Sequence, residues 1–305
     1  LIYDKMSDKT KGFIQAMISS CTFGMIPLFS LPCLNAGMDT LTVVAYRYSL
    51  ASIAMLVIMA FTHQNFKITV REAVSVFVLA LFNNLGAYTL IYGYQFMDTG
   101  AATTLQFSYP VFTCIIMVVC FNEKLTSRTA IAILLAVLGV ACLSGYTPGE
   151  GSTTLLGVGI ELLAGFVYAV YLVLVPILKV RSMNSSKLTF FVFLFSTFQL
   201  LAVSPLAGGI EITTEPSLLV SLLLLGIIPT AVSNYTLILG LKKIGSTTTA
   251  ILGALEPLTA MIIGIFVFGE KMTTLIALGF VAIVTSVIIL ILHRPNKNKR
   301  HVKRL

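Results

Sequence analysis

The sequence has few charged residues. Asp, Glu, Lys and Arg make up 10% of its 305 residues, whereas hydrophobic residues make up 57% and the mean hydropathy is +0.96. Soluble domains carry about 25% charged residues, so this composition indicates an integral membrane protein. The net charge of +8 does not indicate a nucleic-acid partner, because the basic residues form no single face or stripe.

Cysteine and histidine are also scarce, and neither is spaced for a metal. The five cysteines form no Cys-x-x-Cys pair and lie in or beside apolar runs, where they are expected to pack as small apolar residues. The sequence has neither a glycine-rich phosphate loop nor paired carboxylates at helical spacing within a span. We therefore predict no enzyme, no metal site and no bound cofactor. No cleavable signal peptide is expected, and Met6 is a candidate for the natural start.

Ten apolar stretches are each long enough to cross a membrane. A helix needs about 20 apolar residues to span a hydrocarbon core of roughly 30 Å. We therefore predict an all-α membrane protein with ten transmembrane helices. The spans are expected at residues 12–31, 40–62, 73–94, 101–121, 128–146, 154–178, 188–206, 217–240, 247–268 and 273–292.

Basic residues predict the orientation of these spans. Eighteen of the 20 Lys and Arg residues lie in the amino-terminal tail, the even-numbered connections and the tail after Leu292. The opposite side has only Lys271, together with several acidic residues. Because basic residues gather on the cytoplasmic side, both termini are predicted to be cytoplasmic.

The chain also repeats itself at a distance of 147 residues. The segment 88–93 (Tyr-Thr-Leu-Ile-Tyr-Gly) returns as 235–240 (Tyr-Thr-Leu-Ile-Leu-Gly), Pro110 returns as Pro257, and the Glu-Lys pair at 123–124 returns at 270–271. Five spans in each copy is an odd number, so the copies must have opposite orientations in the membrane. We predict two inverted five-helix repeats at 12–146 and 154–292, followed by a basic cytoplasmic tail at 293–305.

These features resemble the drug/metabolite transporter superfamily, in its ten-span branch of two EamA-type units. The resemblance covers about residues 12–292. It depends on Arg47 followed by Ala51, on small-residue fourth and ninth spans that each contain a proline and end in Glu-Lys, and on the run Leu255-Glu256-Pro257. The resemblance implies a central cavity lined by spans one, three, four, six, eight and nine.

The resemblance also implies the function. We expect a secondary transporter in a bacterial plasma membrane that moves an amino acid or related small metabolite by efflux or exchange. A sugar or lipid-linked-sugar permease and a lipid-modifying membrane enzyme remain as alternatives. The expected partners are the substrate and the lipid bilayer, and a homo-oligomer is compatible with the sequence. The sequence identifies neither the substrate, nor the direction of transport, nor the coupling ion.

Three charged residues lie inside the predicted spans, where charge is costly, and each is a candidate for function. By a rise of 1.5 Å per residue, Arg47 and Glu161 lie about 10 Å below the outer surface. They are therefore predicted to pair with each other, or Arg47 could instead meet a substrate carboxylate. A structural role is favoured for Arg47, and Glu161 is counted among the substrate-binding residues. Glu256 precedes Pro257, which frees the carbonyl of Gly253, so Glu256 is predicted to bind substrate or a coupling ion.

Uncharged polar residues complete the predicted binding site. On the third span, Asn84, Tyr88 and Ile91 share one helical face that would line the cavity. The same groups could instead join neighbouring helices. The full set of predicted substrate-binding residues is Glu256, Glu161, Asn84, Tyr88, Gln106, Tyr109, Tyr168 and Asn234.

Overall fold

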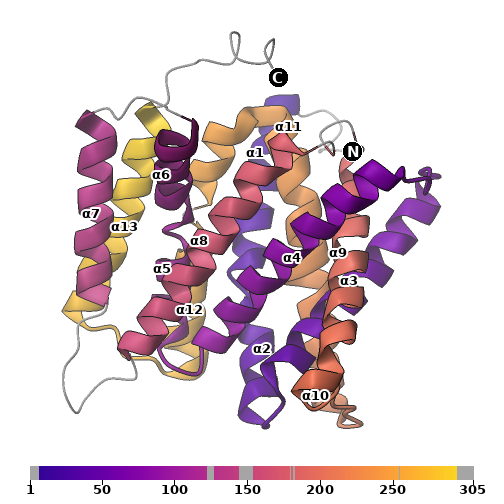
Figure 1. Cartoon of the computed structure of the whole chain (residues 1–305). Coiled ribbons are helices and arrows are strands. Elements are labelled where there is room, and N and C mark those ends of the chain that lie inside the picture. The colour runs from indigo at the N-terminus through magenta and orange to yellow at the C-terminus, as the bar shows by residue number, and fades with distance from the viewer. Residues whose placement is uncertain are drawn as a thin grey trace.

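The computed structural model of the chain describes residues 7–121, 127–143, 154–178, 180, 183–253 and 255–293. Within these residues the chain is helical and contains no strand, which confirms the all-α prediction (Figure 1). The first half comprises α1 (Asp8–Phe23), α2 (Ile26–Asn35), α3 (Thr40–Phe61), α4 (Val70–Gly93), α5 (Thr99–Gln106), α6 (Tyr109–Phe121) and α7 (Ser127–Leu143). The second comprises α8 (Leu155–Ile177), α9 (Ser185–Val203), η2 (Ser204–Ala207), α10 (Pro216–Gly226), η3 (Ile227–Val232), α11 (Ser233–Leu252), α12 (Leu255–Phe268) and α13 (Thr274–His293).

Most apolar helices coincide with the predicted spans, but the predicted connection between the eighth and ninth spans, residues 241–246, is wrong because α11 runs through it from Ser233 to Leu252. In the described part of the chain, seven helical stretches are long and apolar enough to cross a membrane, and three shorter apolar helices accompany them. The shorter ones, Ala130–Gly139, Leu255–Phe268 and Thr274–Ile289, fall on the fifth, ninth and tenth predicted spans. The count of ten and the cytoplasmic termini stay predictions, because length and composition alone identify a span.

Hydrogen bonds between connecting segments define two ends of the bundle. At one end, Asn184 before α9 donates to the side chain of Gln64 after α3 at 2.7 Å. At the other end, Gln95 after α4 donates to Thr40 at the start of α3 at 2.9 Å. The helices α3 and α4 therefore run in opposite directions, and α9 starts at the end of the bundle where α3 ends. The start of α1 and the end of α13 lie at the same end of the bundle (Figure 1).

The two halves of the chain pack on each other in a symmetric pattern. The main pairs across the halves are α1 with α11, α4 with α8, α3 with α9, α5 with α12, and α7 with α13. The repeat of 147 residues maps α1 onto α8, and it maps α4 onto residues 217–240, which comprise α10, η3 and the start of α11, so the first two pairs are equivalent. The pairs α3 with α9 and α7 with α13 map onto themselves, whereas α5 maps onto the end of α11 and α12 onto α6. The pairs other than α5 with α12 have the contact pattern that a pseudo-two-fold axis between two repeats requires.

Four of the predicted spans are interrupted in the described part of the chain, and in the ninth span the break falls between the end of α11 at Leu252 and the start of α12 at Leu255. The first breaks between α1 and α2 at Gly24 and Met25, and the fourth breaks between α5 and α6 at Phe107 and Ser108. In the eighth span the π-helix η3, which contains Pro229, separates α10 from α11. Proline lacks a backbone N–H and disfavours a continuous α-helix, which explains the breaks at the prolines. Interrupted helices of this kind mark binding sites in transporters with inverted repeats.

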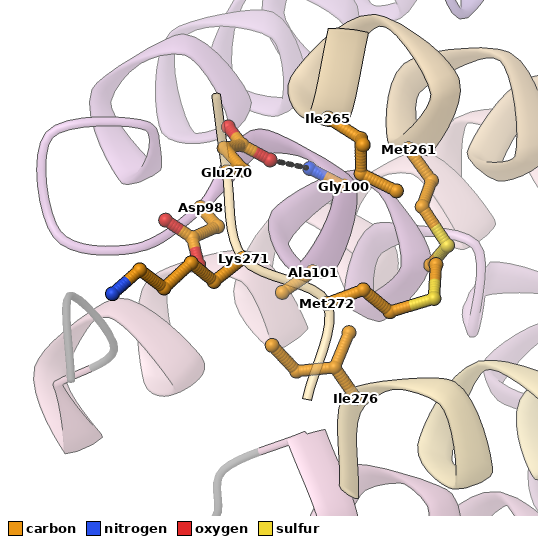
Figure 2. Close-up of a pocket in the computed structure, with 9 residues that line it drawn as sticks. All are labelled: Asp98, Gly100, Ala101, Met261, Ile265, Glu270, Lys271, Met272 and Ile276. Carbon is orange, nitrogen blue, oxygen red and sulfur yellow. Dashed lines mark hydrogen bonds between the residues drawn. The ribbon is translucent and has the colours of Figure 1, made fainter. Parts of the chain in front are cut away.

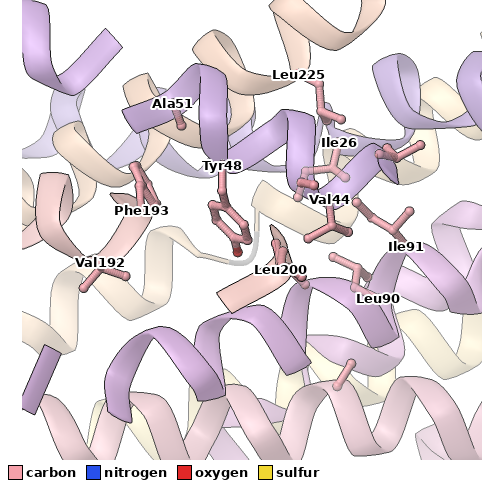
Figure 3. Close-up of a cluster of buried hydrophobic side chains, with 14 of the residues drawn as sticks. Ile26, Val44, Tyr48, Ala51, Leu90, Ile91, Val192, Phe193, Leu200 and Leu225 are labelled. Carbon is pink, nitrogen blue, oxygen red and sulfur yellow. The ribbon is translucent and has the colours of Figure 1, made fainter. Parts of the chain in front are cut away.

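A cluster of buried apolar side chains beside the helix breaks forms the core. Figure 3 shows side chains from α2, α3, α4, α9 and α10 meeting in one cluster, with Tyr48 beside Phe193. The two rings are 5.5 Å apart between centroids. Buried residues of the cluster include Ile26, Val44, Ala51, Leu90, Ile91, Val192, Leu200 and Leu225. This cluster holds α3 and α4 against the second half of the chain.

The charge distribution predicts which end of the bundle faces outward. In a variant without the five native cysteines, single cysteines at Leu206 and Ile212 should react with an impermeant thiol reagent applied to intact cells. Both side chains are exposed, at the end of the bundle opposite to Gln64. A cysteine at Asn65 should react only after the cells are permeabilised. The reverse labelling pattern would contradict cytoplasmic termini.

Candidate functional site: a polar cavity between the two repeats

A cavity lies where the two halves of the chain meet. It is narrow: about 20 Å³ is free for the centre of a water-sized molecule, so a metabolite would enter only if the walls moved apart. Its walls come from α1, α3, α4 and α5 of the first half and from α8 and α11 of the second. The lining residues are Phe23, Arg47, Tyr48, Asn83, Gly86, Ala87, Leu90, Gln106, Tyr168 and Asn234.

The stripe that α4 presents to the cavity differs from the predicted one. Asn83, Gly86, Ala87 and Leu90 follow helical spacing and line the cavity. Ile91, which the sequence placed on the cavity face with Asn84 and Tyr88, is instead fully buried in the apolar core. The cavity-lining residues of α4 follow the predicted helical spacing, but the face that they form is shifted by one residue from the predicted face. The small pair Gly86-Ala87 is the sequence signal that could have identified it, because it leaves room beside Tyr168.

Arg47 on α3 is the charged group of the cavity wall. Its side chain is 2% exposed and lies over the rings of Phe23 and Tyr48, 5.9 and 5.6 Å from their centroids. Its Nε donates to the hydroxyl of Thr230 at 2.8 Å. Its Nη1 is buried and has no hydrogen-bond partner among the described residues. The guanidinium is therefore held in place at one edge while a donor remains unused.

Three of the predicted binding residues are brought together in this cavity: Gln106, Tyr168 and Asn234. Gln106 is the last residue of α5, and its carbonyl faces Gly165 of α8, where an added Cβ would come within 2.9 Å of that oxygen. Asn234 follows the π-helix and donates to the carbonyl of Thr230 at 2.9 Å. The breaks in the fourth and eighth spans thus position both amides.

Tyr109 lies next to Tyr168 of the cavity wall, with the two rings 4.9 Å apart and perpendicular. Glu256, in the first turn of α12, is not among the residues that line the cavity, and its backbone carbonyl lies against Gly24. The carbonyl of Gly253 is not free as predicted, because it accepts a hydrogen bond from the backbone N–H of Glu256 at 2.9 Å.

Glu161 on α8 lies apart from the cavity lining and does not pair with Arg47. It is fully buried, and neither carboxyl oxygen has a hydrogen-bond partner in the described part of the chain. Its side chain presses on Gly93 of α4, where even a methyl group would overlap it. The predicted ion pair fails because the two residues face different neighbours: Arg47 extends toward Thr230 of η3, and Glu161 toward the end of α4.

Asn84 and Tyr88 also lie outside the cavity lining. The amide of Asn84 donates to the carbonyl of Ser196 at 3.1 Å and to the side chain of Gln199 at 2.9 Å, both on α9. Tyr88 stacks on Tyr92 with centroids 5.7 Å apart. These contacts join helices, and a role of either residue in substrate binding stays a prediction.

A second, smaller pocket lies at the end of the bundle where the α12–α13 connection crosses α5. Figure 2 shows Glu270 of this connection beside Gly100. The carboxylate of Glu270 accepts from the backbone N–H of Thr99 at 2.7 Å, from its hydroxyl at 2.6 Å and from the N–H of Gly100 at 3.3 Å. Glu270 therefore caps the amino end of α5, where a negative charge is favoured. Its repeat partner Glu123 lies outside the described residues.

A bundle of apolar helices with a polar cavity between two repeats is typical of membrane transporters. Comparison with known proteins identifies the family. The model of the EamA-like transporter family matches residues 10–145 and again residues 155–292. The chain therefore belongs to the EamA-like transporter family, which confirms the resemblance found in the sequence. It is a membrane transporter and an integral protein of the plasma membrane.

Relatives of similar length support this assignment. The chain is 26% identical over 279 residues to an "Uncharacterized transporter" of Archaeoglobus fulgidus, which covers 91% of this chain and 95% of the relative. It is 22% identical over 293 residues to "Uncharacterized transporter YdfC" of Bacillus subtilis, covering 95% of each chain. A crystal structure of another protein superposes with a TM-score of 0.67 at 12% identity, over 92% of this chain and 96% of that one. That last likeness shows a shared fold alone.

The neighbours Asn83 and Asn84 should respond differently to the same substitution. Asn84→Ala should lower stability by about 0.6–1.7 kcal/mol, because it removes contacts between α4 and α9. Asn83→Ala should change stability less, because its amide makes one long contact of 3.5 Å with Ser196. Thermal unfolding of the purified variants measures both. Equal losses of stability would contradict the assignment of Asn83 to the cavity face.

Proposed function

We propose that this protein is a secondary transporter that moves an amino acid or a related small metabolite across the plasma membrane by efflux or exchange. The observation that carries this proposal is the cavity between the repeats, where Arg47, Asn83, Gln106, Tyr168 and Asn234 converge from both halves of the chain. Convergent polar groups in an otherwise apolar bundle are costly without a ligand. A polar substrate of the size of a metabolite would offset that cost.

Alternating access follows from the way the two halves are joined. The pairing of α5 with α12 crosses between the repeats, and Glu270 closes it at the end predicted to face outward. Opening the cavity outward would separate α5 from the α12–α13 connection and break the cap by Glu270. The motion we propose is therefore a rocking of one repeat against the other about the cavity. The pseudo-two-fold axis allows the opposite end to open by an equivalent motion.

Transport by purified protein in liposomes tests this function. Liposomes loaded with an unlabelled amino acid should accumulate the same labelled amino acid from outside, whereas liposomes without protein should not. Gln106→Ala and Asn234→Ala should each weaken this exchange about five- to tenfold, the loss expected for one hydrogen bond to substrate.

Gln64→Ala is the matched control, because Gln64 lies in a connection at the end of the bundle. Its exchange rate should equal that of the unaltered protein. Exchange that is insensitive to both cavity variants would place the substrate elsewhere. Lack of exchange with amino acids, nucleosides and sugars alike would contradict a transporter of small metabolites.

Glu161 is the group that we propose for coupling transport to a proton gradient. Its carboxyl group is fully buried without a hydrogen-bond partner among the described residues, and it packs against Gly93 at the end of α4. An intramembrane carboxyl group of this kind is a candidate for binding and releasing a proton during the cycle.

Glu161→Gln keeps the shape of this side chain and removes its ability to ionise. We expect this variant to exchange labelled for unlabelled substrate at equal pH on both sides, but to lose accumulation driven by a pH difference. Glu215→Gln, in an exposed connection, should retain both activities. Undiminished gradient-driven accumulation by Glu161→Gln would contradict the coupling role.

A further inference from the structure

The two equivalent helix pairs, α1 with α11 and α4 with α8, make close contacts at opposite ends of the bundle. Near the start of α1, a Cβ added to Gly240 of α11 would lie 3.0 Å from the backbone nitrogen of Ala16 and 3.2 Å from the carbonyl oxygen of Gly12. At the end of α4, a Cβ added to Gly93 would overlap the carboxyl group of Glu161 on α8. The 147-residue repeat relates Gly93 to Gly240. The same contact therefore occurs in two copies, which we call the inner crossing (at Gly240) and the outer crossing (at Gly93).

Further contacts close the outer crossing. A Cβ added to Gly157 of α8 would lie 2.8 Å from the Cβ of Phe96, in the connection after α4. The backbone N–H of Thr154 donates to the carbonyl of Phe96 at 3.1 Å. This is the end of the bundle that the charge distribution predicts to face outward. Since α1 also packs on α11 at the inner crossing, the narrow cavity lies between two closed crossings.

The two crossings differ in the residue that meets the glycine. Ala16 places a methyl group against Gly240, whereas Glu161 places a carboxyl group against Gly93. Glu161 is fully buried, and neither carboxyl oxygen has a hydrogen-bond partner among the described residues. Packing alone does not require this carboxyl group, because a small apolar residue closes the equivalent crossing. Its presence at one crossing only points to a role that its ionisation supplies.

The main neighbours of α8 offer Glu161 no opposite charge within the described part of the chain. These neighbours are α4, α5 and α6. Helix α4 ends at Tyr94, and its charged residues lie in its first turn, at the opposite end. Helix α5 carries no titratable side chain, and Asp98 before it lines the smaller pocket. Helix α6 carries two cysteines and Tyr109, whose ring packs on Tyr168, two turns along α8 from Glu161.

Burial links the proton on Glu161 to closure of the outer crossing. Ionisation in the closed form would leave a charge inside the bilayer with neither a counter-charge nor a hydrogen bond from the described residues, which is strongly unfavourable. Separation of α4 from α8 would admit water, which stabilises the carboxylate. The closed form therefore binds the proton more tightly than the open form. Because this linkage is reciprocal, binding of the proton favours closure and its release favours opening.

We propose that Glu161 makes the outer crossing a proton-dependent gate: its protonated form holds α4 against α8, and its ionisation favours opening toward the outside. The inner crossing, with Ala16 in the same place, lacks this control. This inference rests on the proposed function and adds to the coupling role of Glu161 the gate on which the proton acts. Bound substrate also opens the gate, so exchange at equal pH is still expected for Glu161→Gln.

Access of a thiol reagent to the outer crossing tests the gate. In protein without the five native cysteines, Ala164→Cys introduces a reporter at a fully buried position of α8, one turn from Glu161. Right-side-out membrane vesicles, washed free of solutes and held at equal pH on both sides, are treated from outside with an impermeant thiol reagent. The labelling rate is divided by that of Leu206→Cys, an exposed site, to correct for ionisation of the thiol. This ratio should rise at least about tenfold between about pH 6 and about pH 9.

Substitutions at the crossing separate the effect of charge from that of size. Glu161→Gln keeps the crossing closed without a proton, so its ratio should stay low and constant over the same pH range. Glu215→Gln is the matched control and should keep the rise, because Glu215 is exposed in a connection. Gly93→Ala should raise the ratio at the acidic end of the range, because its methyl group overlaps the carboxyl group. The double variant Gly93→Ala/Glu161→Ala should lower the ratio again, because the carboxyl group is gone.

The outcomes separate this inference from the proposed function. A ratio that does not change with pH when Glu161 is present would overturn the gate, as would a rise that Glu161→Gln retains. If Glu161→Gln does not fold, Glu161→Ala provides the same test, because it gives the outer crossing the residue of the inner one. Ala87→Cys in the cavity wall provides a second reporter.

Solute exchange in liposomes together with a pH-independent ratio would overturn the gate and leave the proposed function intact. A pH-dependent ratio that is lost in Glu161→Gln, without exchange of any solute, would instead overturn the proposed function and support the gate.

Discussion

Backbone polar groups inside a bilayer must find partners within the protein, and this constraint shapes the centre of the bundle. The chain interrupts its spans around the cavity, yet it closes each break locally. Short backbone bonds to the residue three positions earlier tighten the turns, donated by Met25, Ser108 and Glu256 at 3.1, 3.0 and 2.9 Å. In the π-helix, the hydroxyl of Thr230 satisfies the carbonyl of Leu225. The interruptions can therefore turn side chains toward the cavity at little cost in unpaired backbone.

Arg47 and Glu161 do not pair with each other, so each of the two groups can have a separate role. Had they paired, each would have neutralised the charge of the other, and the cavity wall would carry no unpaired charge. Instead Arg47 retains a donor toward the cavity, and Glu161 remains an unpartnered carboxyl group against Gly93. Burying charged groups without partners is energetically costly, and such groups are expected where they have a function. Substrate binding and coupling can then use separate residues.

The sequence predicted the features that depend on composition and repetition. Apolar length located most of the helices, and the 147-residue repeat predicted two related halves of five spans each. It placed Gln106, Tyr168 and Asn234 near the centre, where the structure finds them. It placed Asn84 rather than Asn83 on the cavity face, because a helix in a membrane is apolar on every side and its periodicity does not mark that face. Matched depth likewise could not pair Arg47 with Glu161, since rotation about the helix axis decides which neighbour each side chain meets.

The cavity is most asymmetric where the pseudo-two-fold axis would make its halves equivalent. Tyr109-Pro110 in the first repeat corresponds to Glu256-Pro257 in the second, so a phenol faces the cavity edge where its repeat partner presents a carboxylate. A strictly symmetric cavity would offer the same group at both ends and could not orient a substrate with unlike ends. Arg47 adds to this difference, because its equivalent at position 194 is a leucine. The repeat thus supplies two similar halves, and the positions where the copies differ, Arg47 against Leu194 and Glu256 against Tyr109, make the centre of the bundle asymmetric.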